Sequence, residues 1–101
     1  MWLMCFFDLP VGTPTQRRMA ARFRNHLKKD GFIMLQWSVY ARLCRGESAV
    51  EKHTLRIKGA LPKTGSVRCL HITDKQYGRM QLLLGTAENT EEKATDQLVL
   101  L

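Results

Sequence analysis

The first seven residues of the chain carry no charged side chain, and a single acid, Asp8, follows them directly. The aromatic residues in this run favour a β-strand, and the Leu-Pro pair after Asp8 ends it. Successive side chains of a strand point to opposite faces of the sheet, which gives two apolar sets, Trp2, Met4 and Phe6 on one face and Leu3, Cys5 and Phe7 on the other. A strand that is apolar on both faces has to be covered on both. The fold is therefore restricted to layers packed around this strand.

A helix is predicted next, over residues 13–31. Thr13 fits the N-cap position, Pro14 the first helical position, and Gln16 completes a capping box. Gly31 is a suitable C-terminal stop. The expected apolar stripe consists of Met19, Ala20, Phe23 and Leu27.

The rest of the chain reads as two more strands, a second helix and a fourth strand. Residues 32–44 are strand-like throughout, which is long for one strand, so a bend near residues 36–38 is predicted. A second helix is expected over residues 46–62, with a capping box from Ser48 and Glu51 and Pro62 as its stop. The remaining predictions are a strand over residues 66–73, a turn over 74–80, a short strand over 81–85, and a polar tail that ends in the apolar segment 97–101.

The order strand, helix, strand, strand, helix, strand predicts an α+β fold, a ferredoxin-like βαββαβ sandwich with an extra C-terminal strand. A chain of 101 residues is one domain, here residues 1–85, followed by a tail over 86–101 with a terminal apolar strand over 97–101. Two helices cover one face of a four-stranded sheet and leave the other face open. We expect a second copy of the chain to pack on it sheet to sheet. The alternative is that the chain's own C-terminal strands fold over this face.

The charge balance favours a polyanion as partner. Sixteen Lys and Arg against nine Asp and Glu give a net charge of +7. The first helix carries six Lys and Arg residues but only one acid, Asp30, at its far end. Ion pairs within the helix therefore cannot neutralise these cations. The residues expected to bind nucleic acid are Arg17, Arg18, Arg22, Arg24, Arg42, Arg45, Lys75 and Arg79, with Lys28 and Lys29 on the same helix as Arg17. Contact with phosphates, insensitive to sequence, is the predicted mode, and a merely solvated basic face is the alternative.

Other residue types offer little chemistry. We find no exposed stacking aromatics, since Tyr40 and Tyr77 are the only candidates and both fit core or interface packing. The three histidines lack metal-ligand spacing and are assigned packing or surface roles: His26, His53 and His71. The three cysteines are widely spaced, and we expect buried free thiols: Cys5, Cys44 and Cys69. No apolar run reaches the length of a membrane span, and no signal peptide is evident, so we expect a cytoplasmic protein without a membrane partner.

Asp8 is the candidate catalytic and metal-binding residue. A lone carboxylate beside Phe7 and Leu9 is costly to bury, so it needs either an Arg partner or a hard cation such as Mg²⁺. One Asp makes a poor metal site, but a two-fold axis near the first strand would bring two together. The chain has no P-loop and no Ser-His-Asp set, so any enzymatic activity would depend on Asp8 and a metal.

Three segments occur together and in order, "MWLMCFFDLP", "KDGFIMLQWSVYARLC" and "KHTLRIKGALPKTGSVRCLHITDKQYGRM", with the basic helix between the first two. They resemble the CRISPR-associated Cas2 family, in the version found with Cas9-type systems. The resemblance covers the first 85 residues.

This resemblance implies a homodimer with a ferredoxin-like fold, in which Asp8 of each protomer is the candidate Mg²⁺ ligand. It implies a scaffold in antiviral defence that bridges two dimers of the Cas1 integrase and holds the middle of a spacer DNA duplex by its backbone. It also implies an alternative activity, a metal-dependent endonuclease acting on single-stranded RNA or double-stranded DNA. A toxin-type ribonuclease of similar fold is a third, weaker interpretation. The choice of basic residues is our own interpretation of the sequence.

Overall fold

β1 (Trp2–Asp8) lies in the interior of a four-stranded antiparallel sheet with the order β2-β3-β1-β4. This is the architecture of a computed structural model, which describes residues 1–85. The other elements are α1 (Pro14–Lys29), β2 (Ile33–Gln36), β3 (Val39–Leu43), α2 (Glu47–Lys58), β4 (Ser66–Ile72) and α3 (Asp74–Gly78). The predicted βαββαβ order and the bend between β2 and β3 are confirmed, and the mixed fold is compatible with a ferredoxin-like sandwich. No helix within residues 1–85 is both long and apolar enough to cross a bilayer.

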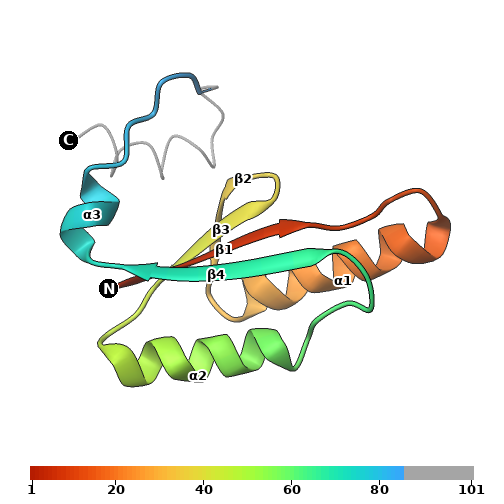
Figure 1. Cartoon of the computed structure of the whole chain (residues 1–101), viewed down its shortest axis with the longest axis horizontal. Helices are drawn as coiled ribbons and strands as arrows, with labels where there is room; N and C mark the ends of the chain where they lie inside the picture. Colours follow the sequence, from red (N-terminus) through yellow and green to blue (C-terminus); the bar gives the residue numbers. More distant parts are fainter. Residues whose placement is uncertain (86–101) are drawn as a thin grey trace.

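One face of the sheet is covered by α1 and α2 (Figure 1). The odd-numbered apolar side chains of β1 lie in this core, where the rings of Phe7 and of Phe23 from α1 form a T-shaped pair with 5.1 Å between centroids. The predicted stripe of α1 is confirmed at three of its four positions, since Met19 is only half-buried and the other three are fully buried: Ala20, Phe23 and Leu27. Burial of this face against the sheet, rather than helix propensity alone, holds α1 in place.

The N-terminus of α1 is capped as the sequence predicts. The Thr13 hydroxyl accepts a hydrogen bond from the Gln16 N–H, and the Gln16 side chain accepts one from the Thr13 N–H, each at 3.1 Å. Pro14 begins the helix, where its missing N–H costs nothing. At the other end, Gly31 adopts a φ of 89°, in the left-handed region that favours glycine.

The predicted cap of α2 is wrong. The helix begins at Glu47 with Gly46 at the N-cap, and no side chain caps it. Ser48 is already inside the first turn and cannot serve as the cap. The helix ends at Lys58, before Pro62 is reached, and its buried residues are Val50, His53 and Ile57.

His53 is buried because Asp30, the residue that caps the C-terminus of α1, binds it. Asp30 Oδ2 lies 2.7 Å from His53 Nδ1, and Asp30 Oδ1 accepts a hydrogen bond from Arg56 Nη1 at 2.7 Å. Arg42 Nε of β3 donates to the Asp30 carbonyl oxygen, also at 2.7 Å. Burial by itself raises the pKa of the Asp30 carboxyl, but the hydrogen bonds from His53 and Arg56 outweigh it. The pKa is therefore lowered from its ordinary value of 3.8.

The second face of the sheet is covered in part by the chain itself. Residues 74–78 form the short helix α3, capped by Thr73 and Gln76, rather than the predicted turn. Tyr77 of α3 stacks on Trp2 with 3.9 Å between ring centroids, and both Tyr77 and Met4 are 4% exposed. The strand predicted over residues 81–85 is wrong, because these residues form no strand. The terminal strand predicted over 97–101 lies outside the described residues.

The cysteines are only partly as expected. Cys5 and Cys44 are buried free thiols, which confirms the prediction, whereas Cys69 is exposed. Cys69 lies on β4, an edge strand of the sheet, directly opposite Cys5 of β1. Its exposure follows from the edge position, which the sequence pattern does not encode.

The link from Asp30 to α2 predicts a pH-dependent contribution to stability. Because the pKa of Asp30 is lowered by folding, its contribution is complete above pH 3.8 and is lost as the pH falls through the folded-state pKa. Asp30→Asn should lower the free energy of unfolding at pH 7 by about 2 kcal/mol, as expected for loss of a charged, buried hydrogen-bond acceptor. Urea denaturation should show this difference shrinking below pH 3.8. Glu51→Gln, an exposed acid of α2, is the matched control, and a difference that stays constant in acid would contradict the assignment.

Candidate nucleic-acid interface

Asp8 stands at the end of β1, exposed to solvent. Strand alternation places it on the same sheet face as Met4 and Phe6, the face opposite α1 and α2. Its backbone is held closely by Gly65, where an added Cβ would lie 2.7 Å from the Asp8 carbonyl oxygen. Gly65 also has a φ of 102°, which side chains rarely adopt. The position of the carboxylate is thus set by β1 and by this close backbone approach.

The Asp8 carboxylate is exposed rather than buried. The Arg partner, one of the two predicted alternatives, is not found within residues 1–85, because no Arg or Lys forms an ion pair with Asp8 there. Nor does that part of the chain hold a cluster of three potential metal-ligating side chains. Mg²⁺ keeps several water ligands and is often bound through one or two carboxylates. Within residues 1–85, the exposed Asp8 carboxylate can therefore supply one ligand of such a site.

Arg68 is a neighbour of Asp8 that sequence reasoning missed. On β4, Ser66 is directly opposite Asp8, and Arg68 is opposite Phe6. Arg68 therefore lies diagonally across from Asp8 on the same face, where such neighbours are about 7–8 Å apart. The sequence contained a signal for this position. Strand alternation places Arg68 on the same face of β4 as Leu70 and Ile72, opposite the face that the helices cover.

The basic residues predicted to bind nucleic acid form three groups. On α1, one shallow depression is lined by Arg18, Ala21, Arg22, Asn25, His26 and Lys29. The first turn of α1 contains no acid, and Asp30 at its far end is already bound to His53 and Arg56. The charges of this depression are therefore not neutralised by acids of their own helix. Arg17 lies nearby and donates to the Val11 carbonyl oxygen at 3.1 Å.

Three further predicted arginines have contacts within the fold. Arg18 Nη2 donates to the Thr15 hydroxyl at 3.2 Å, one turn earlier on the same helix. Arg42 donates to the carbonyl oxygens of Asp30 and Leu43, each at 2.7 Å, so much of its guanidinium is used by the backbone. Arg24 lies over the ring of Trp37, with Cζ 4.3 Å from the ring centroid. Arg45 is exposed in the connection between β3 and α2.

Lys75 and Arg79 belong to a separate region. Lys75 is in α3 and Arg79 caps its C-terminus. Figure 1 shows α3 beside the N-terminus of the chain, whereas Asp8 is at the other end of β1, about 20 Å away along a seven-residue strand. One chain does not bring these cations together with those of α1.

The aromatic residues also differ from expectation. Tyr40 and Tyr77 are 0% and 4% exposed, which confirms their packing role. Trp37, in the turn between β2 and β3, is 67% exposed. Sequence reasoning missed it, and the available signal was a large aromatic placed at the predicted bend.

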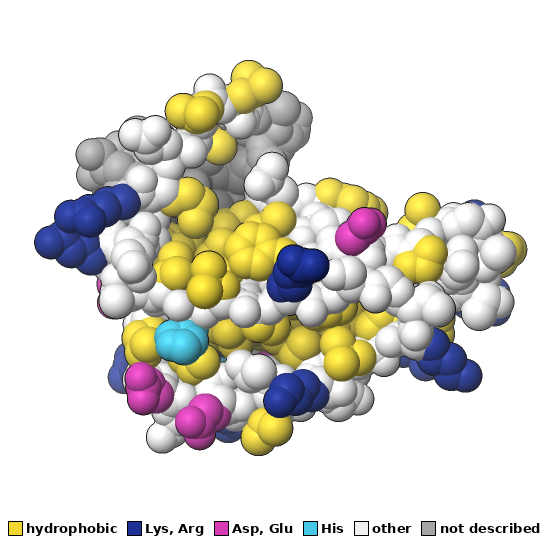
Figure 2. All heavy atoms as spheres, viewed as in Figure 1, with side chains coloured by type: hydrophobic (Ala, Val, Ile, Leu, Met, Phe, Trp, Pro, Cys, Tyr) yellow, Lys and Arg dark blue, Asp and Glu magenta, His cyan; other side chains and the backbone are white. Residues whose placement is uncertain are grey.

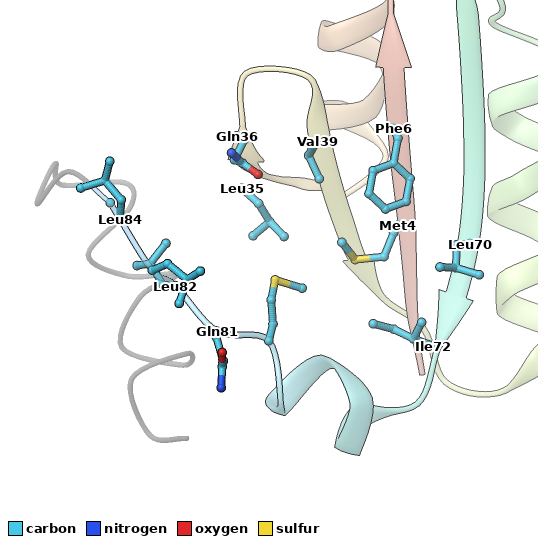
Figure 3. Close-up of a pocket in the computed structure, with 13 residues that line it drawn as sticks. Met4, Phe6, Leu35, Gln36, Val39, Leu70, Ile72, Gln81, Leu82 and Leu84 are labelled. Carbon is cyan, nitrogen blue, oxygen red and sulfur yellow. The ribbon is translucent and has the colours of Figure 1, made fainter.

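The open sheet face is apolar and hollowed. Figure 2 shows hydrophobic side chains gathered over the sheet, to the right of α3 in this view, with charged side chains at the border of the patch. A groove of about 590 Å³ lies between the sheet and the segment after α3. In Figure 3, Leu82 of that segment faces the sheet across it, whereas Leu84 points away. The lining includes Met4, Phe6, Leu35, Val39, Leu70, Ile72, Met80, Leu82, Leu83 and Leu84.

Comparisons with known proteins agree with one another. The model of the family described as CRISPR associated protein Cas2 matches residues 1–80. The chain is 42% identical over 100 residues to the CRISPR-associated endoribonuclease Cas2 of Flavobacterium psychrophilum, covering 99% of this chain and 87% of that protein. Proteins of the same description from Parvibaculum lavamentivorans and Ligilactobacillus salivarius are 42% and 40% identical, over 99% and 100% of both chains respectively.

Proposed function

Because the chain belongs to the CRISPR-associated Cas2 family, we propose that it acts in spacer acquisition as a homodimeric scaffold. In this proposal the dimer binds duplex DNA by its backbone and bridges two dimers of the Cas1 integrase. The observation that carries it is the open apolar sheet face, which bears Asp8 at its edge and leaves the basic face of α1 free on the other side of the sheet. The Cas1 partner and the Cas9-associated subtype rest on the sequence resemblance, and the genes beside this one would test the subtype.

The open face supports a dimer because so much of it stays exposed in one copy. Leu70 is 54% exposed and Leu82 is 48% exposed, although both line the same apolar groove. Contiguous apolar surface of this kind marks interaction sites, and a two-fold axis makes one patch complementary to itself. Packing of two such faces would also bring two Asp8 carboxylates toward each other.

The basic face of α1 supports binding to a duplex backbone. Arg18, Arg22 and Lys29 line one depression, and the first and last are eleven residues apart, about 16 Å along a helix. Phosphates of one DNA strand follow one another every 3.4 Å or so along the axis, so α1 is long enough to meet several. A planar guanidinium binds two phosphate oxygens at once. A dimer would present two such helices to one duplex.

A second candidate function is a Mg²⁺-dependent endonuclease acting on single-stranded RNA or double-stranded DNA. The relatives carry the description endoribonuclease, and Asp8 forms no ion pair within the described part of the chain. When bound, Mg²⁺ would activate a water and stabilise the charge that develops on a phosphodiester. The role of this chain would be to hold the ion through Asp8 and to orient the backbone through the arginines of α1.

The dimer is tested by placing a charge on the open face. Leu70→Glu should leave the chain folded, because this side chain is already half exposed, and should shift the protein to a monomer, since a carboxylate buried between two apolar faces is strongly unfavourable. Analytical ultracentrifugation measures the state. Leu55→Glu on α2, where the wild-type side chain is 64% exposed, is the matched control and should remain dimeric. A wild-type protein that sediments as a monomer at binding-assay concentrations would refute the scaffold.

Duplex binding is tested by reversing charge on α1. Arg18→Glu combined with Arg22→Glu should weaken binding at least tenfold for every duplex sequence tried. It should also reduce the slope of log affinity against log salt concentration by roughly two to four, for one or two protomers in contact. Lys52→Glu with Lys58→Glu on α2 makes the same change in net charge elsewhere and should have a small effect. A loss confined to one sequence would argue against contact with phosphates.

Asp8→Asn separates the two candidate functions, because it removes the charge and keeps the shape. We expect Mg²⁺-dependent cleavage to disappear while duplex binding and spacer integration with Cas1 continue. The assays are cleavage of labelled RNA and DNA, and integration of a labelled duplex, with unfolding curves as the check on folding. If integration also stops in a folded variant, the acid has a part in the scaffold role as well.

A further inference from the structure

Trp37 is held in an unusual position for a large aromatic residue. It is 67% exposed, and the other large exposed hydrophobic side chains within residues 1–85 are aliphatic. Arg24 of α1 lies over its ring, with Cζ 4.3 Å from the centroid. This cation–π contact supports the ring from the α1 side, while most of the indole remains open to solvent.

The turn that carries Trp37 is anchored to the strand that ends in Asp8. The Phe7 N–H donates to the Ser38 carbonyl oxygen at 3.0 Å, and Phe6 pairs with Val39 in the antiparallel ladder. Trp37 precedes Ser38, and Asp8 follows Phe7. Both residues are therefore fixed at the same end of the sheet by backbone hydrogen bonds.

We propose that Trp37, supported by Arg24, stacks on an unpaired nucleobase, so that the nucleic acid bound at this end of the sheet includes single-stranded nucleotides. The faces of bases inside a duplex are already covered by their neighbours, whereas an unpaired base offers a free π-face. The guanidinium of Arg24 adds positive charge beside the ring, which favours the phosphate of the same nucleotide. The inference rests on the proposed nucleic-acid binding and specifies its ligand: an RNA single strand or an unpaired DNA end.

Fluorescence of Trp37 gives a direct test. Trp2 is the only other tryptophan, and Trp2→Phe keeps an aromatic ring against Tyr77 while leaving Trp37 as the sole tryptophan emitter. This protein is titrated with a single-stranded oligoribonucleotide, with single-stranded DNA of the same sequence, and with a blunt duplex of the same length. We expect quenching by a single strand and none by the blunt duplex. The strand that quenches at lower concentration identifies the ligand, and absence of quenching by both would overturn the proposal.

Affinity measurements separate stacking from general binding. Trp37→Ala should weaken binding of the single strand roughly 5- to 150-fold, the range that corresponds to stacking of one base, and should change binding of the blunt duplex less than about twofold. Trp37→Phe should retain most of the affinity. Leu55→Ala, which removes another exposed apolar side chain on α2, is the matched control and should have no effect. Equal losses for single strand and duplex would overturn the stacking role.

Two further outcomes keep this inference distinct from the scaffold proposal. If the wild-type protein binds no duplex but Trp37 is quenched by single strands, the scaffold fails and the stacking site stands. If the emission of Trp37 changes with protein concentration alone and single strands do not quench it, the ring is buried between two copies and the stacking site fails. Unfolding curves of Trp37→Ala that match those of the parent protein confirm that the variant is folded.

Discussion

The two apolar faces of β1 are the constraint on which the rest of the structure depends. β1 pairs with β3 on one side and with β4 on the other. It is therefore an interior strand, and the apolar side chains on both of its faces need cover. α1 and α2 bury the face of β1 that carries Leu3, Cys5 and Phe7. Both helices lie on that side of the sheet, so neither covers the opposite face. The chain covers part of that second face with α3, through the stack of Tyr77 on Trp2. The groove that remains is the feature from which the dimer, and a shared site at Asp8, are proposed.

The acid at the end of α1 is bound within the fold. The Asp30 carboxylate binds His53 and Arg56 of α2. The Asp30 carbonyl oxygen accepts a hydrogen bond from Arg42 of β3, so this residue joins α1, β3 and α2. Its carboxylate is therefore not available to neutralise the cations along α1. The same helix packs an apolar stripe on the sheet and presents unbalanced arginines on its outer side. Positive charge at that surface follows because the acid at the end of α1 is bound inside the fold and the first turn contains none, and phosphate is the partner that such a surface favours.

The structure also assigns different roles to arginines that look alike in the sequence. Arg42 binds two backbone carbonyl oxygens and stabilises the end of α1, and Arg24 lies against an aromatic ring. Arg18 and Arg22 line an open depression, and the one contact of Arg18 is with Thr15 on its own helix. All four were predicted to bind phosphate, because the sequence shows that each is charged but does not show which groups surround it in the fold.

The strand-helix order, the bend before β3 and the capping box of α1 could be read from the sequence, because each depends on residues within a few positions of one another. Three features could not be predicted from the sequence. The start of α2 depends on Gly46 adopting a left-handed φ, and the burial of His53 depends on Asp30, which is 23 residues away in the chain. The exposure of Cys69 depends on β4 being an edge strand. Asp8 as the candidate acid was determined by sequence alone, from its place after an apolar run. Its neighbourhood, with Arg68 across the strand and Trp37 at the anchored turn, was decided only by tertiary structure, because strand register and turn placement bring together side chains that are 29 to 60 residues apart in the chain.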